Sequence, residues 1–77
     1  MNIEFSQHAE LKIKQRKLPW PKILATLAHP DFRQSSYNLR EELFKKFGKN
    51  YLKVVVVYEL NTVVIVTAHW VAQIPKK

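Results

Sequence analysis

The sequence predicts an α+β domain, because helix signals fill its first part and strand-forming residues fill its last part. The segment from Gln7 to Lys17 has a cap residue before it and the charge order of a helix. The segments 52–59 and 62–70 are dense in valine, isoleucine, tyrosine and threonine. Helices followed by strands are typical of the α+β class. Seventy-seven residues have room for one core, so we expect one domain over 1–77.

Two helices are predicted near the N-terminus, over 7–17 and 20–29. Ser6 stands at the N-cap position of the first, and the prolines of Leu18-Pro19-Trp20-Pro21 end it. Proline is tolerated in the first turn of the second helix. The apolar stripe of that helix consists of Ile23, Leu24, Leu27 and Ala28. Residues 1–5 are suited to a short edge strand.

The segments 52–59 and 62–70 predict a hairpin that turns at Asn61. Its valines are nearly continuous, which indicates that both faces of the strands are covered. Two short helices can cover only one face. We therefore expect a second chain, an acidic protein or another copy, on part of the other face.

The segment 38–48 is ambiguous between helix and strand. Read locally it favours a helix, with Asn38 as cap, Glu41 three residues later and Gly48 after the end. Read as a strand, it would turn Leu43 to one face and Phe44 to the other.

Composition limits the possible function classes. Thirteen Lys and Arg against six Asp and Glu give a net charge of +7, which favours a polyanion such as RNA or an acidic protein. The three histidines have no metal-ligand spacing, and a single glycine cannot form a phosphate loop. We expect no metal and no cofactor. Without a signal peptide or an apolar run long enough for a bilayer, the chain is expected to be cytoplasmic.

Three polar side chains recur at steps of four in the first helix. His8, Lys12 and Arg16 would lie in one column, which suits a phosphate track with a proton acceptor at its head. The alternatives are a structural histidine and a solvated lysine face. Lys53 interrupts the apolar strand 52–58 and predicts either a site residue or an edge-strand lysine that blocks aggregation.

The order of these signals resembles a family of small bacterial and archaeal proteins related to the BrnT and RelE toxins. The matching pieces are F-S-Q-H-A (5–9), H-P-D (29–31), E-L-F-K-K-F-G (42–48), Y-L-K-V-V-V (51–56) and V-I-V-T-A-H-W (64–70). The resemblance implies strands at 42–47 and 33–37. It also implies a RelE-like arrangement, with both helices packed on one face of an antiparallel sheet of three to five strands.

The resemblance further implies a metal-independent endoribonuclease toxin with an acidic antitoxin or a second copy as partner. On this reading His8, Arg16 and Lys53 are catalytic, and Lys12, Tyr58 and His69 bind RNA. The sequence departs from the usual pattern at Lys12, where arginine is common, and at His69, where tyrosine is frequent. The alternative is a non-catalytic RNA- or DNA-binding or protein-interaction module.

The hairpin register decides whether Lys53 and His69 share a site. The Asn61 signal favours a loop with an even number of residues, which places the two side chains on opposite faces. Lys53 would then share its face with Val55, Val57 and Trp70, and His69 with Val56 and Tyr58. Only an odd loop or a bulge would bring Lys53 and His69 together. Because the family places a basic residue at 53 more regularly than a histidine at 69, the resemblance assigns Lys53, rather than His69, to the site.

Overall fold

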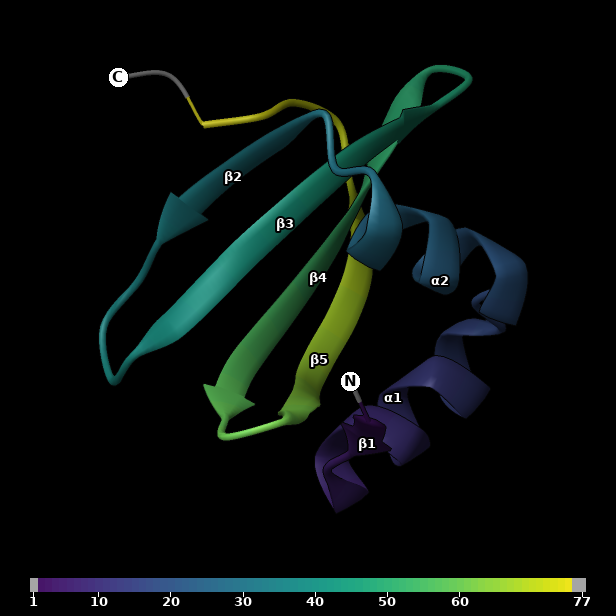
Figure 1. The fold of residues 1–77 in the computed structure, drawn as a ribbon. Helices are drawn as coiled ribbons and strands as arrows, with labels where there is room; N and C mark the ends of the chain where they lie inside the picture. Colours follow the sequence, from purple (N-terminus) through teal and green to yellow (C-terminus); the bar gives the residue numbers. More distant parts are fainter. Residues whose placement is uncertain (1, 76–77) are drawn as a thin grey trace.

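A computed structural model describes residues 2–75 and confirms the α+β class (Figure 1). Two helices follow a short first strand, and four further strands complete a sheet. In chain order the elements are β1 (Asn2–Phe5), α1 (Gln7–Arg16), α2 (Trp20–Ala28), β2 (Phe32–Ser35), β3 (Arg40–Phe47), β4 (Asn50–Glu59) and β5 (Thr62–Val71).

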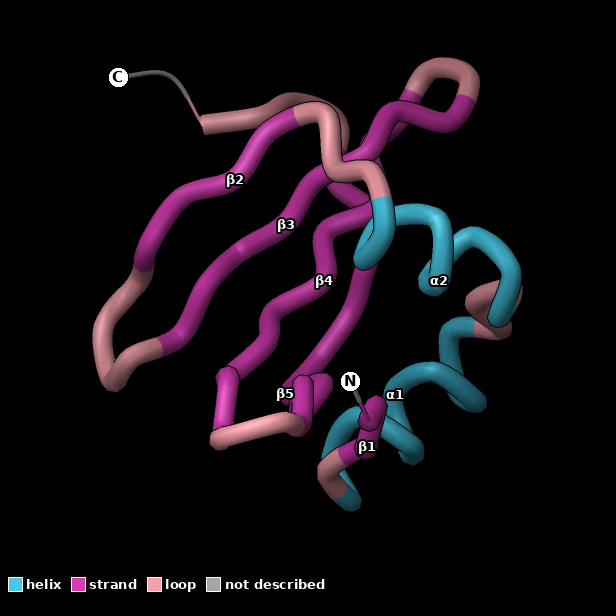
Figure 2. The backbone as a smooth tube through the Cα atoms, in the orientation of Figure 1, coloured by secondary structure: helices cyan, strands magenta, loops and turns pink. Residues whose placement is uncertain are grey.

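The sheet is mixed rather than wholly antiparallel. Its strand order is β1-β5-β4-β3-β2, and neighbouring strands from β2 to β5 pair antiparallel (Figure 2). The expectation of a purely antiparallel sheet is wrong at β1, which pairs parallel with β5 from Asn2↔Thr62 to Phe5↔Ile65. The connection from β1 to β5 contains both helices and three strands, so it is long enough for a parallel crossover.

Strand β3 confirms the interpretation drawn from the resemblance and contradicts the local helix rules. Asn38, read as a helix cap, lies in the turn between β2 and β3 with φ of 61°. Gly48, read as a helix C-terminal residue, lies in the turn between β3 and β4 with φ of +67°. Both residues tolerate the left-handed region, which hairpin turns and helix ends require alike. Pairing with β2 and β4 on either side of β3 then stabilises the strand.

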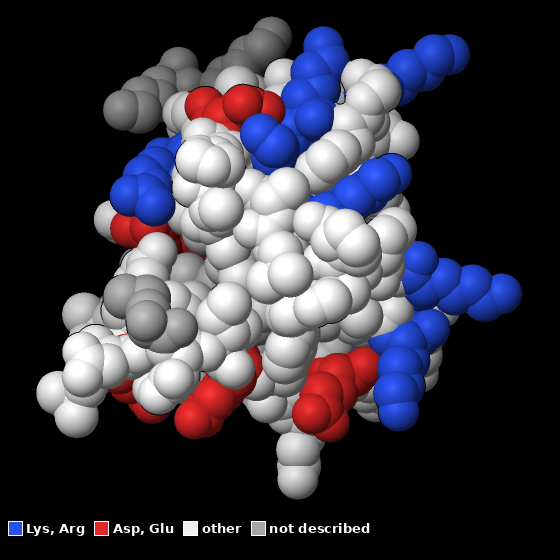
Figure 3. Space-filling model, turned by 45° about the vertical axis from the view of Figure 1, so that its right-hand side comes forward, with Lys and Arg blue, Asp and Glu red and all other residues white. Residues whose placement is uncertain are grey.

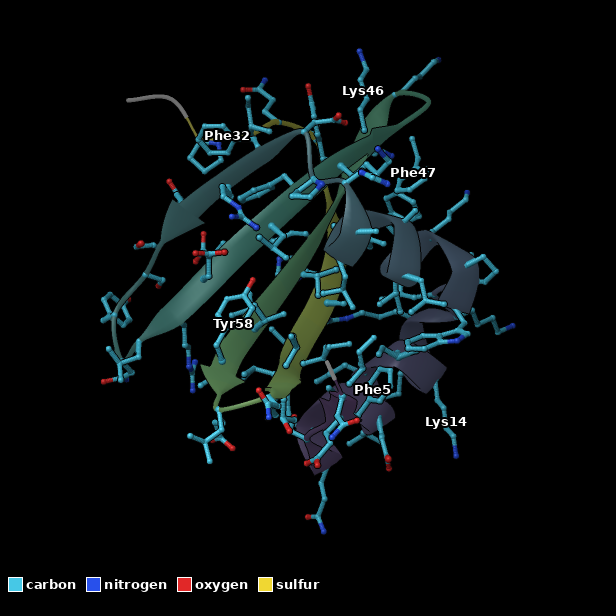
Figure 4. All side chains as sticks on the ribbon, in the orientation of Figure 1. Phe5, Lys14, Phe32, Lys46, Phe47 and Tyr58 are labelled. Atoms are coloured by element: carbon cyan, nitrogen blue, oxygen red, sulfur yellow. The ribbon has the colours of Figure 1, made fainter. Side chains whose placement is uncertain are left out.

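The hydrophobic core lies between the helices and the sheet. Helix α1 contacts β5, and α2 contacts β4 and β3. The buried core side chains are Ala9, Leu18, Ile23, Leu43, Leu52, Val54, Val56, Val63, Ile65 and Ala68. Phe5 and Phe47 pack against this cluster from opposite ends (Figure 4). The ring of Phe5 also lies 4.9 Å from that of Trp20, which joins β1 to the start of α2.

A β-bulge divides β5 into two halves. Near the turn Val56 pairs with Ile65, but Val55 pairs with Thr67, so Val66 is an extra residue without a partner on β4. The Ser6 hydroxyl donates to the Val66 carbonyl at 3.1 Å and accepts from the Ala9 backbone N–H at 3.0 Å. Ser6 is therefore the predicted N-cap of α1, and it also ties the helix to the bulge.

Replacing Ser6 with alanine is expected to lower the free energy of unfolding by about 1 kcal/mol or somewhat more. The substitution removes the cap of α1 and also leaves the Val66 carbonyl without its hydroxyl donor. Urea unfolding measures the loss. Ser35→Ala, at an exposed strand position, is the matched control and should change little. Equal losses in the two variants would contradict this role for Ser6.

Candidate functional site

Lys53 and His69 face each other directly across the hairpin. They are paired residues on β4 and β5, and paired residues of an antiparallel ladder point to the same face. The register prediction is therefore wrong, because the bulge at Val66 shifts the pairing by one residue. Trp70 consequently pairs with the core residue Leu52 and lies on the helix side, not beside Lys53.

The face that carries Lys53 and His69 is the one without helices. The alternate residues of β4, namely Leu52, Val54 and Val56, belong to the core beneath the helices. We call the opposite surface the open face. It also contains Val55 and Val57, as predicted for the face of Lys53.

Arg16 reaches the same region from the end of α1. Its Nη1 donates to the Ala68 carbonyl at 2.7 Å, next to His69 along β5. Strand β1 pairs only with residues 62–65, so this carbonyl lies on a part of β5 that has no outer strand among residues 2–75. A guanidinium has five N–H donors, so Arg16 keeps further donors for an anion.

The imidazole of His69 lies in a positive environment. Its pKa is lowered from the ordinary value of 6.5, first by partial burial and then by the charges of Lys53 and Arg16; the carboxylate of Glu42 opposes this effect. The neutral form of His69 is therefore favoured at neutral pH. A neutral imidazole beside two cations can accept a proton from a group whose charge those cations stabilise.

Lys53 is held in place by neighbours on β3. Its ammonium lies 3.6 Å from Glu42 Oε1 and 5.8 Å from the centroid of the Phe44 ring. Phe44 is almost fully buried and packs against Phe32 of β2. The Lys53 ammonium therefore lies over the Phe44 ring and beside the Glu42 carboxylate.

The remaining predicted site residues lie elsewhere. His8 is exposed in the first turn of α1, about 12 Å from Arg16 along the axis at roughly 1.5 Å per residue. Lys12, which lies between His8 and Arg16 in the sequence, is half-buried. The three side chains are spaced to contact successive phosphates of a polyanion. His8 and Arg16 are too far apart to contact the same phosphate.

Tyr58 is not part of the site. Its hydroxyl donates to Glu41 Oε1 at 3.2 Å on the side of the sheet that bears the core, and Arg33 pairs with the same carboxylate. Partial burial and the charge of Glu41 raise the pKa of Tyr58, while Arg33 opposes the rise. Figure 4 shows Tyr58 near the turn end of β4, beside β3.

Sequence reasoning missed Glu42 and Gln34, the two other polar partners on the open face. Gln34 Nε2 donates to Glu42 Oε1 at 2.8 Å, and the two residues are paired between β2 and β3. The alternation of side chains along β3 was the one pattern that could have placed Glu42 on the same face as Lys53. The helix-like pattern of the same segment obscured that alternation.

Charge and apolar surface are distributed unevenly. In Figure 3 the basic side chains lie mainly at the top and right, and several acidic ones lie along the lower edge. Among residues 2–75 the large exposed hydrophobic side chains lie on the helices, at loop tips or on the helix side of the sheet, and none lies on the open face. The open face thus presents buried and half-buried valines rather than an exposed apolar patch.

Within the described part of the chain there is no cluster of three potential metal ligands. In the same part, neither helix is long and apolar enough to cross a membrane. Comparison with protein-family models, with curated proteins and with solved structures gave no match.

Replacing Lys53 with methionine is expected to raise the pKa of His69 toward 6.5, because one of the two cations that disfavour the imidazolium is removed. NMR titration of the imidazole signals measures the shift. Lys46→Met is the control, since Lys46 pairs with Tyr51 further along the strand and is not among the charges acting on His69. An unchanged or lowered pKa in Lys53→Met would contradict the proposed geometry.

Proposed function

We propose that this protein is a metal-independent endoribonuclease with a RelE-like fold, acting in the cytoplasm as the toxin of a toxin–antitoxin pair. The observation that carries the proposal is the position of a neutral His69 imidazole between Lys53 and Arg16 on the open face. The net charge of +7 suits a polyanionic substrate. The family resemblance of the sequence points in the same direction.

The proposed reaction needs only groups of the chain and of RNA. The neutral imidazole of His69 accepts the proton of a 2′-hydroxyl, whose oxygen attacks the adjacent phosphorus. The bond to the 5′-oxygen breaks, and the Lys53 ammonium can give that oxygen a proton. The products are a 2′,3′-cyclic phosphate and a 5′-hydroxyl. Arg16 stabilises the negative charge that develops on the phosphoryl oxygens.

His69 replaces His8 as the proposed base, because His69 has both cations beside it. His8 and Lys12 fit better as contacts to a neighbouring phosphate along α1. Tyr58, on the other side of the sheet, is left out of the reaction. An acidic antitoxin or a second copy remains our proposed partner, and the positive charge of the chain supports an acidic one.

The first test is cleavage of single-stranded RNA in EDTA by the purified chain. His69→Ala is expected to lower the single-turnover rate about 100-fold or more, the usual contribution of a positioned acid or base. His29→Ala is the control, because His29 is an exposed residue at the end of α2 and far along the chain from the site. Wild-type activity in His69→Ala, or equal losses in both variants, would overturn the assignment.

The alternative function is RNA binding without cleavage, which the same basic groups would support. Arg16→Ala is expected to reduce the slope of log affinity against log salt by about 0.7, the value for one contact to a single-stranded phosphate. The ligand for this titration is a single-stranded oligonucleotide with 2′-deoxy sugars, which stays intact because it lacks the attacking 2′-hydroxyl. Lys14→Ala is the control, since Lys14 points away from α1 into solvent (Figure 4).

A reduced slope combined with no cleavage of ordinary RNA would favour the binding module over the nuclease. An unchanged slope in Arg16→Ala would mean that Arg16 contacts no phosphate, and would remove it from both the nuclease and the binding-module proposals.

A further inference from the structure

Among residues 2–75, Glu42 is the only carboxylate that pairs with a basic group of the open face. Its Oε1 accepts from Gln34 Nε2 at 2.8 Å and lies 3.6 Å from Lys53 Nζ. Both contacts fall on one oxygen, from β2 on one side and β4 on the other. We infer that Glu42 is a positioning residue that holds the Lys53 ammonium beside His69, with Gln34 fixing the carboxylate. The chemistry this serves rests on the proposed nuclease function.

The surroundings explain why Lys53 needs such a partner. The Glu42 and Lys53 side chains are only 16% and 23% exposed, so each charge has lost much of its hydration. Arg16 adds a further positive charge near the same imidazole. Without a carboxylate, the lysine head would lower its energy by turning away toward water, and Phe44 beneath it offers only a weak cation–π attraction.

Gln34 is suited to orient the carboxylate without changing its charge. An amide N–H₂ donates a hydrogen bond to one carboxylate oxygen, whereas a lysine at this position would compete with Lys53 for the same carboxylate. Gln34 is half-buried on β2, and its Cα is paired with that of Glu42. Strand β2 therefore contributes to the site through the carboxylate of Glu42.

The same arrangement acts on the protonation of His69. The charged groups around the imidazole come from three elements: Arg16 from α1, Lys53 from β4 and Glu42 from β3. Among the described residues, Glu42 is the group that favours the imidazolium, so it limits how far the two cations lower the pKa of His69. A base whose pKa stays near the working pH is more effective than one lowered too far.

The test is NMR titration of His69 in the full chain carrying Glu42→Gln, which keeps the shape of the side chain and removes its charge. If Glu42 holds Lys53 beside His69, the lysine turns away in this variant and no longer acts on the imidazole. Adding Lys53→Met is therefore expected to raise the pKa of His69 in the wild-type background and to change it little in the Glu42→Gln background. Glu41→Gln is the matched control, since Glu41 is the preceding residue on β3, faces the other side and pairs with Tyr58 and Arg33. In its background, Lys53→Met should raise the pKa of His69 as it does in the wild type.

Gln34→Ala provides a second variant that keeps every charge and tests the orientation of the carboxylate. In this background too, the rise caused by Lys53→Met is expected to be smaller than in the wild type, and the variant keeps the inference testable if Glu42→Gln does not fold. A full rise on adding Lys53→Met to the folded Glu42→Gln and Gln34→Ala variants, or an equally reduced rise in the Glu41→Gln background, would overturn the inference.

Cleavage kinetics separate this inference from the proposed function. If the chain cleaves RNA, Glu42→Gln should lower the single-turnover rate, because Lys53 no longer stands beside His69, and Glu41→Gln should leave the rate unchanged. A chain that cleaves no RNA but loses the effect of Lys53 on His69 in Glu42→Gln retains the positioning role and loses the nuclease function. A chain that cleaves RNA but keeps the full effect of Lys53 on His69 in Glu42→Gln retains the function and loses the role of Glu42.

Discussion

The extra residue at Val66 is the constraint on which the candidate site depends. If the pairing near the turn continued without it, His69 would stand opposite Leu52 and point into the core, and Ala68 would stand opposite Lys53. The bulge instead places the small Ala68 in the core and the imidazole on the open face. Bulges often re-aim a side chain in this way next to functional sites.

The N-terminus of α1 and the bulge stabilise one another. Ser6 caps the helix and donates to Val66, and its backbone N–H donates to Ile65, the last residue of β5 that pairs with β1. Beyond that point Arg16 donates to the Ala68 carbonyl. The outer edge of β5, which would otherwise expose unpaired backbone groups, is thus covered by polar side chains of one helix. The same contact brings a guanidinium to the side of His69.

The open face combines charges that repel one another with one carboxylate that offsets them. Arg16 and Lys53 disfavour a third positive charge on His69, and Glu42 partly compensates. Such a cluster contributes little to stability, because half-buried charges lose hydration when they pair. Its arrangement suits the binding of a further anion, which would relieve the repulsion between the two cations. Phosphate is such an anion, and the proposal of RNA as substrate rests on this physical match.

The sequence by itself determined the elements whose local signals were unambiguous: the α+β class, the capped α1, the proline-initiated α2 and the valine-rich hairpin. It also identified Lys53 as a charge within an apolar strand, and Arg16 as one of a column of polar residues on the first helix. It did not determine β3, because Asn38 and Gly48 suit helix ends and hairpin turns equally, and pairing with two neighbouring strands decided between them. Nor did the sequence determine which of the candidate site residues lie close together. That depended on one unpaired residue, whose place follows from contacts between Ser6 and Val66, 60 positions apart in the chain. A bulge reverses every side chain beyond it, and the alternation of a sequence rich in valine on both faces carries no mark of where that reversal occurs.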